Sequence, residues 1–217
     1  MESIQKGIVR IMFKNLKRYL VITFVFCLLA SINVFAATET YTVQRGDTLW
    51  KIANKYQVGL SEIISANSHF ANPHMIHPGD KVYIPLLDAE TLSFEEEVVV
   101  LVNAERAKQG LRPLQMNWQV ARVARYKSDD MRDNNYFSHT SPLYGSPFDM
   151  LKKFNVSYRS AGENIAKGQK TAKAVVNAWM NSEGHRKNIM NSGFTEIGVG
   201  YSVGRGSTYW TQIFITP

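Results

Sequence analysis

The single cysteine of this 217-residue chain lies inside an apolar run near its N-terminus, and this placement constrains the fold more than any other feature. Basic residues precede the apolar run Tyr19–Ala30, and Val34 and Ala36 follow it at the spacing expected of a cleavage site. A basic segment, an apolar segment and small residues in this order are typical of a signal peptide, which we expect over residues 1–36. The run is shorter than the roughly 20 apolar residues that cross a membrane, and an uncleaved anchor is the alternative.

Cleavage after Ala36 would remove Cys27, so the exported chain would have no disulfide, although small exported domains commonly depend on them. Packing alone would hold the fold, and a hydrophobic content of 45% permits a buried core. The leader holds five of the 25 basic and one of the 18 acidic residues. The other residues carry 20 basic and 17 acidic side chains, and this charge of +3 does not favour nucleic acid as a partner. A membrane is expected only through the signal segment.

The first part of the exported chain has the pattern of a small β-α-α-β unit. Alternating and β-branched residues predict strands, and capped apolar faces predict helices. Asp47 or Thr48 is expected to cap the first helix and Ser61 the second. The expected elements are a strand at Thr40–Val43, helices at Leu49–Tyr56 and Glu62–Asn67, and a returning strand at Lys81–Ile84.

The stretches Tyr41–Ala53 and Ile76–Pro85 resemble a LysM domain, which we place at residues 38–86. The resemblance implies binding to N-acetylglucosamine glycans such as peptidoglycan or chitin, in a groove between the first strand–helix loop and the second helix–strand loop. Such loops offer backbone donors and acceptors and a small apolar contact to acetamido groups. The glycan-binding residues implied are Gly46, Asp47, Thr48, Leu49, Pro73, Met75 and Ile76.

Two alternatives remain open in these loops. Asp47 and Thr48 could serve only as helix caps, although capping would also fix the loop that binds. His69, His74 and His77 could hold a metal ion, but histidines in a solvated loop are the favoured explanation of the cluster.

After a linker at residues 87–92, the segment 93–217 reads as an α+β domain. Ser93 is the expected cap of its first helix, which would place Glu95, Glu96 and Glu97 in the first turn, where acidic residues suit the helix dipole. Candidate core positions of the second helix are Val120, Ala121, Ala124 and Met131. The expected elements are helices at Phe94–Lys108, Trp118–Asn134, Ser146–Phe154 and Thr171–Met180, and strands at Glu196–Val203 and Thr208–Ile215 joined by a turn at Gly204–Gly206.

Carboxylates and imidazoles recur in three irregular stretches of this segment. Glu183 and His185 are two residues apart, which gives them a common direction on an extended chain but not on a helix. Gly184 between them disfavours a helix, so we expect an extended segment that brings both side chains to one site. His139 and Glu163 lie upstream in similar polar stretches.

The stretches Phe137–Pro142, Gly162–Ile165 and Trp179–Met190 resemble three signature stretches of the CAP superfamily, the cysteine-rich secretory, antigen 5 and pathogenesis-related 1 proteins, also called SCP-like. The resemblance runs from about Ser93 to Pro217 and implies an α-β-α sandwich. The family's cavity tetrad falls on His139, Glu163, Glu183 and His185.

The tetrad suits two kinds of chemistry. Neutral imidazoles ligate Zn²⁺ well, and we expect Zn²⁺ or another divalent metal on His139 and His185 if the chain binds a cofactor at all. Glu163 or Glu183 could then act as general base, or a Glu–His pair could do acid–base work without metal. A Ser–His–Glu triad is not favoured, because the sequence shows no nucleophile elbow.

These observations predict an exported bacterial protein in which LysM tethers a CAP binding or regulatory module to the cell wall or the spore envelope. Its partners would be peptidoglycan or another N-acetylglucosamine polymer and envelope proteins. One alternative is a metal-assisted hydrolase of wall peptide, glycan or protein, with the tetrad as catalytic residues. Another is a structural envelope or spore-coat component.

Overall fold

The computed structural model describes residues 38–217, so the expected signal peptide lies outside the described residues. No helix within residues 38–217 is both long enough and apolar enough to cross a membrane. The two domains expected from the sequence are called the LysM domain and the CAP domain, after the families that they resemble.

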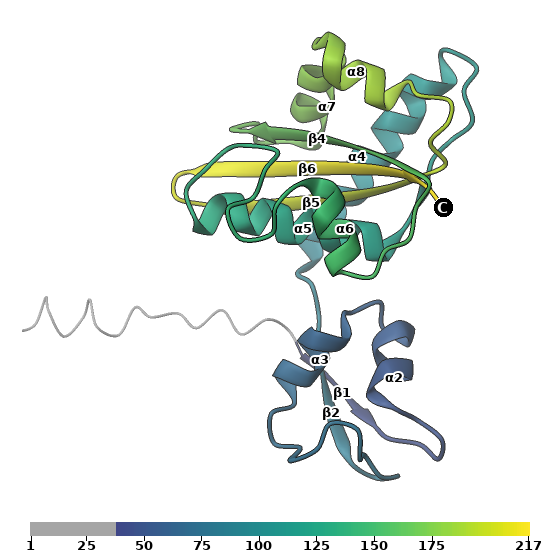
Figure 1. Cartoon of the computed structure of the whole chain (residues 1–217), viewed down its shortest axis with the longest axis vertical. Helices are drawn as coiled ribbons and strands as arrows, with labels where there is room; N and C mark the ends of the chain where they lie inside the picture. Colours follow the sequence, from purple (N-terminus) through teal and green to yellow (C-terminus); the bar gives the residue numbers. More distant parts are fainter. Residues whose placement is uncertain (1–37) are drawn as a thin grey trace, which may run out of the picture. The chain divides into compact units, whose positions relative to one another are not determined.

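The LysM domain has the predicted β-α-α-β order (Figure 1). Strands β1 (Thr38–Thr42) and β2 (Lys81–Pro85) pair antiparallel. Helices α2 (Leu49–Lys55) and α3 (Leu60–Ala66) lie between them in sequence. The hydrophobic side chains buried in this domain come from α2, α3, β2 and the loop after β1: Val43, Leu49, Ile52, Ala53, Ile63, Val82 and Ile84. An isolated two-stranded sheet is marginal in water, so these helices are needed for stability.

Polar side chains fix the ends of the LysM helices. Thr48 caps α2 by accepting a hydrogen bond from Lys51 N at 3.2 Å, as predicted. The predicted cap at Ser61 is wrong, because α3 begins at Leu60, two residues before the predicted start, with Gly59 at its N-cap. Asn67 is buried at the other end of α3. Its side-chain amide donates hydrogen bonds to Ile63 O and Tyr83 O and accepts one from Tyr83 N. This amide ties α3 to β2.

The CAP domain contains a four-stranded sheet in the order β3-β5-β6-β4. Its strands are β3 (Gln115–Met116), β4 (Ser160–Lys167), β5 (Glu196–Gly204) and β6 (Ser207–Thr216). The predicted hairpin joins β5 to β6, with positive φ angles at Arg205 and Gly206. Strands β3 and β4 were not predicted, and β4 forms the edge that carries Glu163.

Helices cover both faces of the sheet, which confirms the α+β class and the sandwich (Figure 1). On one face lie α5 (Trp118–Asp133) and α6 (Pro147–Lys153). On the other lie α4 (Ala89–Ala107), α7 (Ala172–Met180) and α8 (Glu183–Ile189). All four predicted core positions of α5 are fully buried.

The approach of α5 to the sheet depends on two glycines of β5. A Cβ atom at Gly198 would lie 2.1 Å from Ala121 N, and one at Gly200 would lie 2.2 Å from the carbonyl carbon of Ala124. Any other residue would therefore push α5 away from the sheet.

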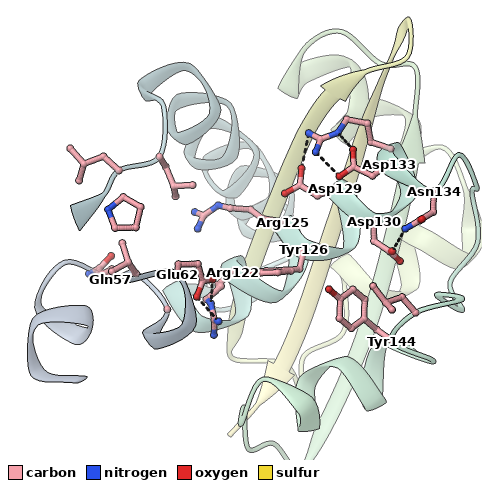
Figure 2. A pocket seen from close by; sticks show the side chains of 17 residues that line it. Gln57, Glu62, Arg122, Arg125, Tyr126, Asp129, Asp130, Asp133, Asn134 and Tyr144 are labelled. Atoms are coloured by element: carbon pink, nitrogen blue, oxygen red, sulfur yellow. Dashed lines mark hydrogen bonds and ion pairs between the residues drawn. The ribbon is translucent and has the colours of Figure 1, made fainter. Parts of the chain in front are cut away.

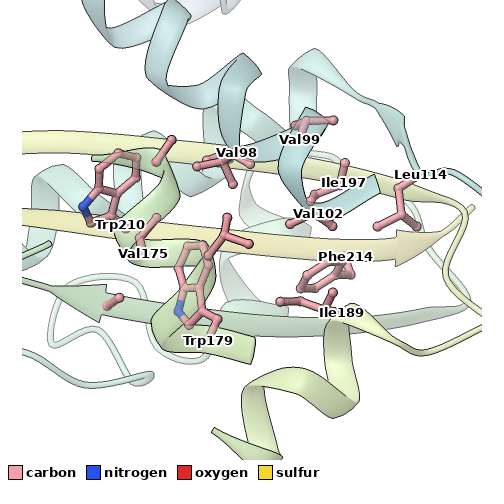
Figure 3. Close-up of a cluster of buried hydrophobic side chains, with 14 of the residues drawn as sticks. Val98, Val99, Val102, Leu114, Val175, Trp179, Ile189, Ile197, Trp210 and Phe214 are labelled. Atoms are coloured by element: carbon pink, nitrogen blue, oxygen red, sulfur yellow. The ribbon is translucent and has the colours of Figure 1, made fainter. Parts of the chain in front are cut away.

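The larger core of the domain lies under α4 and α7. Val98 and Val102 of α4 pack with Trp179 of α7 and with Trp210 and Phe214 of β6 (Figure 3). Full burial of each such side chain contributes about 1.5–3 kcal/mol, which is how a domain without disulfides is held.

Two expectations about helix boundaries are wrong. Helix α4 begins at Ala89 and is capped by Asp88, so the residues after Asp88 in the expected linker are helical. Glu95 therefore lies well inside the helix, and its buried carboxylate pairs with Arg125 and not with the helix dipole. The segment at Glu183–His185 is helical and not extended, because it forms the first turn of α8.

Candidate functional site

The four tetrad residues lie on three elements of the CAP domain. His139 lies in the loop between α5 and α6, and Glu163 lies in the edge strand β4. Glu183 and His185 lie in α8. The structure brings some of these side chains together and separates others.

His139 and Glu163 form a direct pair. His139 Nδ1 lies 2.7 Å from Glu163 Oε1, with the glutamate side chain 2% exposed and the imidazole 54% exposed. Burial raises the pKa of the Glu163 carboxyl, and His139 and Lys127 oppose that rise. Within residues 38–217, Glu163 Oε2 has no hydrogen-bond partner although it is buried. The pair therefore uses one imidazole nitrogen and leaves Nε2 for another molecule.

Glu183 does not join this pair in the structure. It occupies the first position of α8, and its carboxylate lies 2.8 Å from Lys187 Nζ with both side chains 74% exposed. Two residues apart on a helix, Glu183 and His185 point about 200° away from each other. Ser182 adopts an extended conformation at the N-cap, and Arg186 N donates to Ser182 O at 2.8 Å, so Gly184 is accommodated in the first helical turn.

His185 is held beside the pair by amide side chains. Asn164 Nδ2 donates to His185 O at 3.1 Å, and Asn188 Nδ2 donates to Asn164 Oδ1 at 2.9 Å and to Glu163 O at 3.1 Å. Burial lowers the pKa of His185, and the charge of His139 lowers it further, so the two imidazoles are within electrostatic reach. These asparagines tie α8 to β4.

The residues present do not complete a zinc site. A catalytic zinc usually has three protein ligands, and the described part of the chain contains no group of three or more His, Cys, Asp or Glu side chains placed to hold a metal. His139 and His185 as metal ligands therefore remain a prediction.

Sequence reasoning missed the polar groups beneath His139. Lys127 of α5 is fully buried and donates to His139 O at 2.9 Å and to Tyr136 Oη at 3.1 Å. The signal was present in the sequence, because Lys127 follows Ala124 by three residues and precedes Met131 by four on the face predicted to be apolar.

The two LysM loops that were predicted to bind glycan contain both polar and apolar side chains. Asp47 accepts hydrogen bonds from Gln44 N and Tyr41 Oη, both at 2.8 Å, and these bonds lower its pKa. Leu49 is buried in the core, so only its backbone can face a ligand. Met75 in the second loop is 62% exposed. Pro73 and Ile76, the other predicted glycan residues of that loop, flank it in the chain.

Comparisons with known proteins follow the division into two domains. The model of the cysteine-rich secretory protein family, CAP, matches residues 99–214, and the LysM domain model matches residues 41–85. The uncharacterized protein YkwD of Bacillus subtilis (strain 168) is 65% identical over 123 residues, which are 57% of this chain and 47% of YkwD. The spore coat assembly protein ExsA of Bacillus cereus is 47% identical over 47 residues, 22% of this chain and 7% of ExsA.

A solved structure supports the same fold. An extracellular protein containing an SCP domain from Bacillus anthracis str. Ames is 39% identical, with a TM-score of 0.56 over 64% of this chain and 47% of that one. The chain spans about half the length of YkwD and of the anthracis protein. The matched residues, the sandwich and the sequence identities together establish that this chain belongs to the CAP family and carries a LysM domain ahead of its CAP domain.

Proposed function

We propose that this chain is an exported envelope protein whose LysM domain holds it on the N-acetylglucosamine glycan of peptidoglycan. The CAP domain would then act on or bind a component of the wall through the site at His139 and Glu163. Glycan binding is the property that the LysM family brings. The SCP-containing relative from Bacillus anthracis, which is described as extracellular, supports export.

The structure of the LysM loop between β1 and α2 is the main support for the proposed glycan binding. The Thr48 and Asp47 side chains are both used within the protein, and they fix the loop. Within residues 38–217, the backbone N–H groups of Thr48 and Ile76 donate to no protein acceptor. Such fixed, open donors suit the carbonyl oxygen of an acetamido group, and the exposed Met75 supplies an apolar contact for its methyl.

Sedimentation with purified peptidoglycan sacculi or insoluble chitin tests the tether. Residues 37–217 should co-sediment, and Met75→Glu should weaken binding about tenfold because a solvated charge replaces an apolar contact. Leu143→Glu is the matched control, because Leu143 is equally exposed but lies in the CAP domain. Equal binding by both variants would contradict the proposed groove. A single LysM domain is expected to bind weakly and to act by raising local concentration.

A spore-envelope location is a finer proposal within the same function. It rests on the 47-residue match to ExsA, whose name describes a spore coat assembly protein. Fluorescence microscopy of a tagged chain in a sporulating host would decide between the growing wall and the forming spore.

The geometry at His139 also favours a second candidate, a hydrolase of wall peptide, glycan or protein. An imidazole that gives one nitrogen to a buried carboxylate can accept a proton from water at the other, and the carboxylate stabilises the imidazolium that forms. Glu163 would hold the ring, His139 Nε2 would be the base, and a bound divalent metal and Glu183 remain part of this hypothesis.

Turnover is tested by incubating residues 37–217 with sacculi, with and without Zn²⁺, and assaying new amines and reducing ends. Release by the wild type that is lost in His139→Ala and Glu163→Gln would establish the hydrolase, and Glu183→Gln would show whether that side chain takes part. Binding without release would leave the tethered binding module or a structural envelope component.

A further inference from the structure

The loop that carries His139 is held in an unusual way. Residues 137–140 are exposed, and Asn135 before them has a positive φ angle of 51°. Within residues 38–217, the hydrogen bond from Lys127 Nζ to His139 O is the only one that a backbone group of residues 137–140 makes outside that stretch. Apart from the contact of its ring with Glu163, the position of His139 therefore depends on one buried ammonium group.

Lys127 belongs to a continuous chain of hydrogen bonds. Its ammonium donates to Tyr136 Oη at 3.1 Å, and the Tyr136 hydroxyl donates to Asp130 Oδ2. Asp130 also accepts from Ser141 Oγ at 2.6 Å and from Asn134 Nδ2 at 2.7 Å, the second of which is drawn in Figure 2. The chain thus connects a buried carboxylate on α5 to both ends of the loop that carries His139.

Charge explains why a lysine can be buried at this position. Glu163 and Asp130 both favour the charged form of Lys127, although burial lowers its pKa. The Lys127 ammonium donates to His139 O, and the His139 ring contacts Glu163. The charge of Lys127 therefore also acts on the Glu163 carboxylate, which orients the imidazole. A methionine would fill the space at much lower desolvation cost, so packing does not account for a lysine on this face.

We propose that Lys127 is a positioning residue of the CAP site: its ammonium fixes the His139 loop on the Tyr136–Asp130 anchor and holds the imidazole against Glu163. The inference rests on the proposal that His139 and Glu163 are the working groups of the domain. It concerns the geometry of these groups and not the molecule they act on.

The absence of cysteine after residue 36 allows a test in which only the charge is varied. Lys127→Cys in residues 37–217 is alkylated while unfolded and then refolded. The thiolate displaces bromide from 2-bromoethylamine to give a side chain of lysine length that ends in an ammonium. With 1-bromopropane it gives a side chain of the same length that ends in a methyl group. Circular dichroism verifies that each product has refolded.

The measurement is ¹⁵N-detected histidine NMR, which reports the His139 tautomer and the rate at which its Nδ1 proton exchanges with water. His139→Ala assigns the signal among the five histidines. The aminoethyl protein should match the wild type, with the proton on Nδ1. The propyl protein should lose the single tautomer, and its Nδ1 proton should exchange about tenfold faster, the factor expected for one charge-assisted hydrogen bond.

A propyl protein with the wild-type tautomer and exchange rate would overturn the proposal. If the propyl protein does not refold, Tyr136→Phe decides, because it keeps Lys127 and removes only the hydroxyl that links its ammonium to Asp130. An Nδ1 exchange rate at least about threefold faster supports the proposal, as expected when one of two bonds is lost, and a smaller change overturns it. Neither result depends on glycan binding or turnover, so failure of the proposed function is distinguished from failure of this inference.

Discussion

Glu95 offers a quantitative test of what holds the CAP core together. Its side chain is fully buried in α4, and Arg125 of α5 donates to it from Nε at 2.8 and 2.9 Å and from a terminal nitrogen at 2.6 Å. Tyr201 N of β5 also donates to it, at 3.2 Å. Burial nevertheless raises the pKa of Glu95 from 4.5 to about 7, with the bonds from Arg125 opposing the rise.

The raised pKa of Glu95 determines the sign and the size of the change in unfolding free energy with pH. Between pH 4.5 and about 7 the folded protein binds the Glu95 proton while the unfolded chain has released it. The free energy of unfolding should therefore be highest below pH 4.5 and should fall as the pH rises to about 7. The interval from 4.5 to about 7 corresponds to a loss of about 3 kcal/mol, and above pH 8 the contribution should be constant.

Comparison with Glu95→Gln isolates this contribution. Urea unfolding of residues 37–217 is followed by tryptophan fluorescence from pH 4 to 8 in a Trp50→Phe background, so that only CAP tryptophans report. The difference in unfolding free energy, wild type minus Glu95→Gln, should fall by about 3 kcal/mol across the window. The exposed neighbour Glu96 gives the control, and Glu96→Gln should follow the wild type. A difference that is flat, or that rises with pH, would show that pairing with Arg125 outweighs burial and would refute the reasoning.

Further changes test separate parts of the structure. Thr48→Ala should destabilise the LysM domain by about 1 kcal/mol through loss of the α2 cap, measured as a lower melting temperature. Trp179→Ala should destabilise the CAP domain by about 3–5 kcal/mol, measured by urea unfolding, because it removes a buried indole. Lys187→Ala should leave the melting temperature unchanged, because its pair with Glu183 is exposed. Asn188→Ala should cost about 1–3 kcal/mol in urea unfolding and should move the His185 NMR signals, because two bonds between α8 and β4 are lost.

Local sequence signals were sufficient for elements with their own caps and periodicity. Helix α5 follows from its apolar face and ends within one residue of the prediction. Helix α6 follows from Ser146, whose capping box with Asp149 is present in the structure. The hairpin β5–β6 follows from alternation around a glycine turn. In each case the residues that decide the structure are adjacent in the chain.

Elements whose stability comes from distant partners were not predictable in this way. Strand β4 lacks a β-branched alternating pattern and is set by its pairing with β6, in which Glu163 lies opposite Ile213. Glu95 looked like a first-turn residue because its partner Arg125 is 30 positions away. Tertiary context overrides local propensity at such positions. The family resemblance identified His139 and Glu163, but only the fold shows that their side chains meet.

The position of β4 at the sheet edge explains how the site is divided. Successive side chains of a strand point to opposite faces, so Glu163 meets His139 while Asn164 meets the carbonyl of His185. An edge strand exposes backbone groups that can pair with another chain. Asn188 of α8 covers one of these groups by donating a hydrogen bond to Glu163 O. Helix α8 thus protects the edge and also brings His185 within electrostatic reach of His139. The two imidazoles approach one strand from two separately anchored segments, the His139 loop on Lys127 and α8 on Asn164 and Asn188, so loosening either anchor should disturb one histidine and leave the other in place.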